Sequence, residues 1–163
     1  MDVLSSAIDW FLDPLNWSGD FGIPKRLLEH VGISLLASAI AFSVAFPTGL
    51  YIGHSRRFEF LAVSVANMGR ALPSFGVLAL VFPFTFQLGS GLGGFAFLPT
   101  LISLILLGIP PILTNTYVGI KGVDPDSVEA ARGMGLREIE ILRSLEAPVS
   151  APLIVAGLRN SAV

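Results

Sequence analysis

The residue types that most often carry catalysis are sparse in this chain. It has no cysteine, which excludes a thiolate metal site, a cysteine nucleophile and a disulfide framework within it. Its two histidines, His30 and His54, stand just outside apolar stretches, and neither has another histidine or a carboxylate at metal-ligand spacing. We interpret both as interfacial residues at the ends of membrane spans. The sequence therefore predicts no catalytic residue, no metal site and no cofactor-binding site.

Arg70 is the charged residue with the most unusual position. It stands in an apolar stretch, about residues 60–86, close to Asn67 and Pro73. A charged side chain near the middle of a bilayer costs at least a few kcal/mol unless it faces a cavity or a partner. We expect Asn67, Arg70 and Pro73 to line a pathway or a contact between spans; the alternative is that Arg70 pairs with helix carbonyls or a lipid headgroup. Direct binding of a cationic solute is disfavoured, because like charges repel.

Residues 123–148 are rich in charge and read VDPDSVEAARGMGLREIEILRSLEAP. Asp124 can cap a first helix, and Pro125 suits its first position because that N–H would be unpaired anyway. Gly133 and Gly135 are expected to end the helix, since glycine tolerates left-handed backbone geometry. The pattern predicts a short first helix that presents a low-profile face of small residues.

A second helix is predicted over Leu136–Leu145. Leucine and isoleucine recur every third residue along it, as do arginine and glutamate with alternating sign. Charged residues three apart can form surface ion pairs. We expect Pro148 to stop this helix and to begin the next apolar stretch. The result is a helix-turn-helix, half apolar and half charged; the alternative is an amphipathic linker that rests on lipid headgroups.

Long apolar stretches must position this segment. Hydrophobic residues make up 53% of the chain and charged residues only 13%, against about 25% charged in a typical soluble domain. A stretch of about 20 apolar residues can cross the roughly 30 Å hydrocarbon layer. We predict an all-α, polytopic membrane helical bundle over residues 31–163. Its expected spans cover about residues 31–53, 60–86 and 95–120, with an incomplete fourth at 148–163 and a charged loop at 121–147.

Residues 1–30 differ from the spans, because aromatic and acidic side chains alternate there. Trp10, Phe11 and Trp17 stand among four aspartates. Aromatic rings with polar edges favour the headgroup zone of a membrane. We expect an external amphipathic segment that begins with a short helix on the membrane surface; the alternative is a disordered tail.

Basic residues predict the orientation. Because three spans separate residues 1–30 from the charged loop, the two regions face opposite sides. One side has only Lys25 and Arg26, and the other side has six basic residues: Arg56, Arg57, Lys121, Arg132, Arg137 and Arg143. The more basic side of a membrane protein is usually cytoplasmic. We therefore place the charged loop in the cytoplasm and the amino terminus outside, in a multi-pass protein of the plasma (inner) membrane.

The charged loop resembles the cytoplasmic signature loop of permeases from binding-protein-dependent ABC importers. That signature is Glu-Ala-Ala, three residues, Gly, nine residues, then Ile-x-Leu-Pro. The residues of this chain at the matching spacing are Glu129, Ala130, Ala131, Gly135, Leu145 and Pro148, with Ala147 where the family has leucine. The resemblance implies a MetI-like permease fold in which these residues couple the chain to an ATPase subunit.

Two segments resemble the osmoprotectant branch of that family. They are NMGRALPSFGVLAL at 67–80 and IPPILTNTYVGIKGVDPDSVEAARGMG at 109–135. The resemblance implies import of a quaternary ammonium compound such as glycine betaine, choline or carnitine. The alternative within the family is a permease for another small solute, such as an amino acid.

The resemblance also implies partners. They are a second permease chain, two cytoplasmic ATPase subunits, an external solute-binding protein and the lipid bilayer. The chain has no G-x-x-x-x-G-K-[ST] loop to hold phosphates, so ATP is expected on a separate subunit, and this chain is not expected to be an enzyme. A net charge of −2 argues against a nucleic-acid partner.

Two other classes of membrane protein remain as alternatives. A secondary transporter or channel subunit would need carboxylates or broken-helix ion sites inside the membrane, whereas all twelve carboxylates stand outside the predicted spans. A membrane enzyme would need a cluster of His, Asp, Ser or Cys at the membrane edge, and the sequence offers none.

We also expect the chain to be a fragment. Its fourth apolar stretch, 148–163, has sixteen residues, which reach about 24 Å against a hydrocarbon layer of roughly 30 Å. We expect this chain to insert into a membrane but to support no solute uptake, even with ATPase and binding protein supplied.

Overall fold

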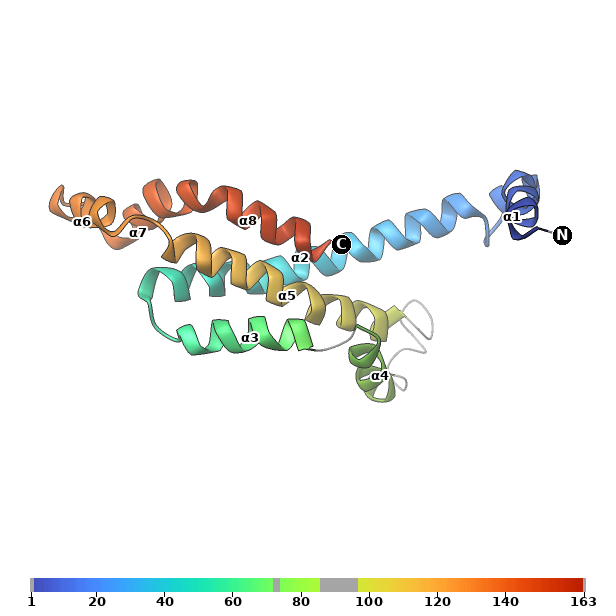
Figure 1. Cartoon of the computed structure of the whole chain (residues 1–163), viewed down its shortest axis with the longest axis horizontal. Helices are drawn as coiled ribbons and strands as arrows, with labels where there is room; N and C mark the ends of the chain where they lie inside the picture. The colour runs from blue at the N-terminus through green and yellow to red at the C-terminus, as the bar shows by residue number, and fades with distance from the viewer. Residues whose placement is uncertain (1, 72–73, 86–96, 163) are drawn as a thin grey trace. The chain divides into compact units, whose positions relative to one another are not determined.

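The structure, a computed structural model, describes residues 2–71, 74–85 and 97–162 (Figure 1). Within these residues all regular secondary structure is helical and there is no strand, which confirms the predicted all-α fold class. The elements are α1 (Val3–Leu12), η1 (Pro14–Trp17), α2 (Ile23–Ser55), α3 (Glu59–Ala71), α4 (Ser74–Thr85), α5 (Phe97–Lys121), α6 (Pro125–Gly133), α7 (Glu138–Ile141), the π-helical turn η3 (Leu142–Glu146) and α8 (Ala147–Ser161).

The chain divides into two compact units, Met1–Leu36 and Ala37–Val163. In the first unit, the short helix α1 folds back on η1. The indole N–H of Trp17 donates to the carbonyl of Phe11 at 2.7 Å, and the two rings meet edge to face at 5.1 Å. Trp10, Phe11 and Trp17 are all exposed. The first unit therefore presents exposed aromatic rings, and its location on the outer membrane surface stays a prediction.

Helix α2 begins at Ile23, eight residues before the predicted span, and runs unbroken through Pro47 to Ser55. Serine and threonine side chains bond within it, as expected: Ser43 Oγ donates to the Ala39 carbonyl at 2.8 Å and Thr48 Oγ1 to the Val44 carbonyl at 2.7 Å. These bonds satisfy polar groups that a membrane interior would leave without water.

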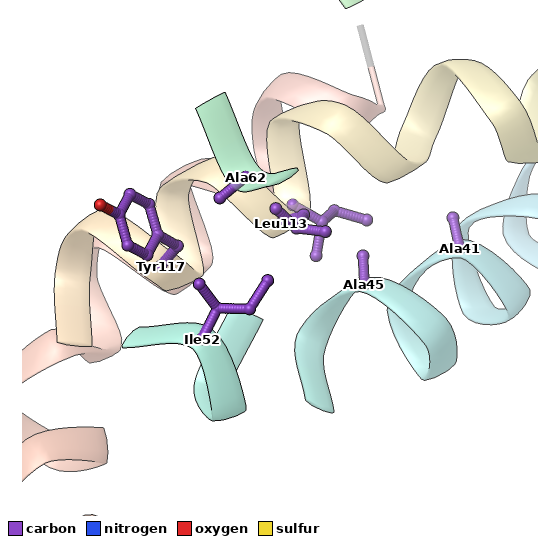
Figure 2. Close-up of a cluster of buried hydrophobic side chains, with 7 residues drawn as sticks. Ala41, Ala45, Ile52, Ala62, Leu113 and Tyr117 are labelled. Carbon is purple, nitrogen blue, oxygen red and sulfur yellow. The ribbon is translucent and has the colours of Figure 1, made fainter. Parts of the chain in front are cut away.

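One face of α2 is lined with small residues that let α5 approach closely. Side chains of Ala41, Ala45 and Ile52 point toward Leu113 and Tyr117 of α5 (Figure 2). At Gly49, an added Cβ would lie 2.8 Å from Thr116 Cβ, and at Gly53 it would lie 2.7 Å from Ile120 Cβ. Small residues at helix contacts are typical of membrane bundles, where backbones pack at short range.

The stretch predicted as the second span, about residues 60–86, is described as two helices. They are α3 over Glu59–Ala71 and α4 over Ser74–Thr85, and residues 72, 73 and 86 lie outside the described residues. Both helices pack against α5. That this stretch crosses the membrane as one span stays a prediction.

Helix α5 is the central element of the second unit, since it contacts α2, α3, α4 and α8. It overlaps the predicted third span over residues 97–120 and continues through Pro110 and Pro111. Among the described residues, three helices are long and apolar enough to cross a membrane: Ile23–Ser55, Phe97–Lys121 and the continuous helix Glu138–Ser161. These lengths agree with the predicted multi-pass membrane protein.

Candidate functional site

Helix α6 begins as the sequence predicted. Carboxylate oxygens of Asp124 accept hydrogen bonds from the backbone N–H of Asp126 at 3.4 Å, from that of Ser127 at 3.2 Å and from the Ser127 hydroxyl at 2.8 Å. The Ser127 bonds hold the pKa of Asp124 below its ordinary value, because they stabilise the ionised form. Pro125 occupies the first turn. Asp124 is therefore the N-cap of the helix that carries the Glu-Ala-Ala triplet.

Gly135 ends this helix by a specific hydrogen-bond pattern. Its N–H donates to the Arg132 carbonyl at 2.9 Å, and the Leu136 N–H donates to the Ala131 carbonyl at 3.2 Å. These are the two bonds of a Schellman motif, which requires a left-handed residue at the position of Gly135. Its φ is +86°. The glycine of the signature is thus fixed by backbone geometry.

The loop has a small core of its own. Four buried side chains form this core: Val123, Val128, Ala131 and Ile141. Two partly buried leucines, Leu136 and Leu145, pack against them. Glu129, Ala130 and Pro148 are exposed. The signature residues therefore divide into a set that holds the loop together, Ala131, Gly135 and Leu145, and a set that faces outward, Glu129, Ala130 and Pro148.

The expectation that Pro148 stops the second helix is wrong. The helix starts at Glu138 rather than Leu136 and continues through η3 into α8, giving one helix over Glu138–Ser161. In η3 the Ala147 N–H bonds to the Leu142 carbonyl, five residues back. In an α-helix the ring of a proline clashes with the carbonyl four residues before it, and the wider π-type turn relieves this crowding. The chain thus passes from loop to α8 without a break.

One ion pair joins α6 to α7, and a second lies within the first turn of α7. Arg132 binds Glu138 with both ends of its guanidinium, at 2.7 Å and 3.0 Å, and this carboxylate raises the pKa of Arg132. Arg137 pairs with Glu140 at 2.8 Å, three residues on, as the sequence predicted. Both pairs are well exposed, so each contributes at most about 1 kcal/mol.

His54, at the end of α2, contacts the loop. Its Nδ1 lies 2.6 Å from Glu146 Oε2, and its Nε2 lies 3.3 Å from Glu138 Oε2. Glu146 is buried and His54 is largely so, with side-chain exposures of 7% and 18%. His54 stands in the last turn of α2, and its interpretation as an interfacial residue stays a prediction. The sequence indicated neither partner, because the two carboxylates stand more than 80 positions away. No local spacing signal reveals such a contact.

A further pair joins α5 to α3 at the same end of the unit (Figure 1). Lys121 Nζ lies 2.7 Å from Glu59 Oε2 and 3.0 Å from the Tyr117 hydroxyl. The ends of α2 and α5, the start of α3, and the loop therefore meet. The segments that carry the six basic residues used to predict the orientation lie together here.

The predicted pathway residues are less well described. Asn67 is exposed on α3; the side chain of Arg70 and all of Pro73 lie outside the described residues, so their role stays a prediction. A cavity of about 370 Å³ is lined by residues of α3, α5 and α8. They are Ala66, Leu107, Pro110, Pro111, Thr114, Asn115 and Asn160. Asn115 and Asn160 stand in apolar stretches of the sequence, and polar residues at such positions could have indicated this cavity.

Comparison with known proteins places the chain in a family. Residues 45–163 match the family described as "Binding-protein-dependent transport system inner membrane component". The chain belongs to this family. The match includes the whole of α5, the loop and α8, together with the end of α2 that carries His54.

Curated relatives within this family resemble the chain at moderate identity. It is 36% identical over 135 residues to the carnitine transport permease protein OpuCB of Listeria monocytogenes, covering 83% of this chain and 58% of that protein. It is 33% identical over 138 residues to the choline transport system permease protein OpuBB of Bacillus subtilis, covering 85% and 60%. The chain thus spans about three fifths of the length of these relatives.

Proposed function

We propose that the chain is the transmembrane subunit of an ATP-driven importer for a small quaternary ammonium osmoprotectant, such as glycine betaine, choline or carnitine. Family membership over residues 45–163 supports the permease assignment. The solute class is supported by relatives named for carnitine and choline transport. The cavity lined by Thr114, Asn115 and Asn160 is polar but uncharged, which suits weak binding of a solute that must leave again.

The observation that carries the proposal is the division of the signature residues. Ala131, Gly135 and Leu145 make the loop a small folded body, and Glu129 and Ala130 stay on its outer surface. A folded body with an exposed helix can seat in a cleft of an ATPase subunit and transmit its movement. ATP is assigned to that separate subunit, and this chain to transport rather than to an enzyme.

The importer we propose needs further partners. A second permease chain completes the pathway, and an external solute-binding protein delivers the solute. The loop with Arg137 faces the cytoplasm, and the amino terminus faces outside. The six-to-two distribution of basic residues supports this orientation.

Uptake with competitors tests the solute class. The ATPase and binding protein would be reconstituted in vesicles together with a permease that contains residues 1–163 and is extended to the length of the curated relatives. Radiolabelled glycine betaine would be the solute. We expect ATP-dependent uptake that choline or carnitine suppresses and that amino acids leave unchanged. Uptake without ATP would favour a secondary transporter or channel. Competition by an amino acid alone would indicate a permease for amino acids instead of quaternary ammonium compounds.

Cysteine labelling tests the orientation, because the chain has no native cysteine. A membrane-impermeant maleimide added outside intact cells should modify a Ser90→Cys variant and leave an Arg137→Cys variant unmodified. Ser90 lies outside the described residues, so this arm tests the sequence prediction alone. Labelling of Arg137→Cys from outside would reverse the proposed topology.

A further inference from the structure

The end of α2 carries a histidine that lies between two carboxylates of the signature loop. His54 Nδ1 is 2.6 Å from Glu146, and His54 Nε2 is 3.3 Å from Glu138. We call these three residues the histidine latch. Glu138 is also the residue that Arg132 of α6 binds with two hydrogen bonds. A continuous chain of charged contacts thus runs from α6, through Glu138, to α2.

The contact gives a buried group a partner. A carboxylate oxygen lies beside each ring nitrogen of His54, and a ring N–H can donate to the carboxylate beside it. Glu146 is buried, and a buried carboxylate without a partner is strongly destabilising. His54 supplies that partner.

No other cation is paired with Glu146 in the part of the chain that the structure describes. Arg132 is engaged by Glu138. On the side of α5, which packs against Gly53 through Ile120, the nearest charged residue along that helix is Lys121, and its ammonium is engaged by Glu59. His54 is therefore the side chain in direct contact with Glu146, and α2 supplies it; Arg132 adds a longer-range attraction to the same carboxylate.

We infer that His54 is a positioning residue that fastens α2 to the signature loop, so that displacement of the loop by an ATPase subunit moves a membrane helix. The inference rests on the proposed function. The loop continues directly into the bundle only through α5 and α8, and the latch adds a side-chain connection to a third helix, α2.

Four variants test the latch. His54→Gln replaces the ring with a neutral amide, Glu146→Gln removes the carboxylate nearest to the ring, and His54→Lys places an ammonium at the same position. The matched control is His30→Gln, which changes the other histidine, exposed in the first unit. Each would be measured in the intact importer for solute uptake, for ATP hydrolysis, and for hydrogen exchange of the amides of residues 138–146.

We expect His54→Gln and Glu146→Gln each to raise the exchange of residues 138–146 and to lower uptake per ATP by about tenfold, as loss of one partner of a buried pair implies. His54→Lys should restore part of the coupling, because a lysine ammonium at this position can also donate to the Glu146 carboxylate. His30→Gln should behave as wild type.

The outcomes separate the latch from the transport assignment. Unchanged exchange and coupling in His54→Gln would overturn the latch, and a fully tolerated Glu146→Gln would overturn the contact with Glu146 as its basis. A loss of coupling in His54→Lys equal to that in His54→Gln would overturn the role of charge. Exchange is read without solute: a wild type that transports none of the tested solutes, yet shows the exchange changes in the variants, refutes the proposed solute class and supports the latch.

Discussion

Two neighbouring residues, Gly53 and His54, attach the end of α2 in opposite ways. Gly53 lets α5 approach to backbone distance, because an added Cβ would lie 2.7 Å from Ile120 Cβ. His54 instead reaches the signature loop through two carboxylates. The first contact depends on the close fit of two backbones, and the second depends on polar groups that face one another. Small residues therefore hold the helices of the bundle together, and ionic contacts hold together the end that we assign to coupling.

The largest effect is expected where a side chain is forced into the shape-dependent contact. Gly49→Leu places atoms against Thr116, since even a Cβ would lie 2.8 Å from Thr116 Cβ. We expect α2 and α5 to separate, with a loss of about 3 kcal/mol or more of folding free energy. Thermal unfolding in detergent measures it.

The matched control is Gly32→Leu in the same helix, since nothing lies within 4 Å of an added Cβ there. Its melting temperature should stay close to wild type. Equal destabilisation by both substitutions would mean that helix propensity, rather than the α2–α5 contact, determines the loss.

A smaller effect is expected from strain in the loop. Gly135→Leu forces a left-handed backbone, at φ +86°, on a residue with a Cβ, which costs about 1–2 kcal/mol. Nothing lies within 4 Å of the added Cβ, so the effect should come from the backbone alone. We expect membrane insertion to continue while ATP hydrolysis becomes uncoupled from uptake.

Gly133→Ala is the control for this loop variant, because an added Cβ meets nothing within 4 Å and Gly133 lies in the helix without a left-handed φ. Its ratio of uptake to ATP hydrolysis should match wild type. A Gly135→Leu protein that transports normally would refute the assignment of the loop to coupling.

Reversing the exposed charge of Glu129 should change the association of this chain with the ATPase subunit without changing the fold. Glu129 is exposed and has no ion pair among the described residues. We expect Glu129→Lys to reduce the ATPase recovered with the purified permease several-fold and to leave its melting temperature unchanged. Glu29→Lys, at an exposed glutamate of the first unit, is the control. Equal recovery of the ATPase with both variants would show that the ATPase does not dock at Glu129.

The smallest effect concerns the helix cap. The pKa of Asp124 is lowered in the folded chain from an ordinary value of 3.8. Its contribution is therefore present above that value and is lost as the pH falls below it toward the lower, folded-state pKa. We expect Asp124→Ala to raise hydrogen exchange at Asp126 and Ser127 near neutral pH. An unchanged exchange rate there would show that the cap does not hold α6.

Much of the fold followed from local patterns. Uncharged stretches predicted the helices over 31–53 and 95–120, and the residues Asp124, Pro125 and Gly135 predicted both ends of α6. These signals are reliable because a cap or a left-handed turn depends on a few adjacent residues. The same local reasoning failed at Pro148, because a π-type turn accommodates a proline that an α-helix would not.

Sequence alone determined that the chain is helical, that its apolar stretches are of membrane length, and that residues 129–148 carry a signature spacing. Only the tertiary structure decided which signature residues face inward, that α3 and α4 both pack against α5, and that His54 meets Glu138 and Glu146. The physical reason is the separation along the chain over which each interaction acts. Helix caps and hydrophobic length act between neighbours in the chain, whereas a buried charge is balanced by whichever partner the fold brings within about 3 Å, here from 92 positions away.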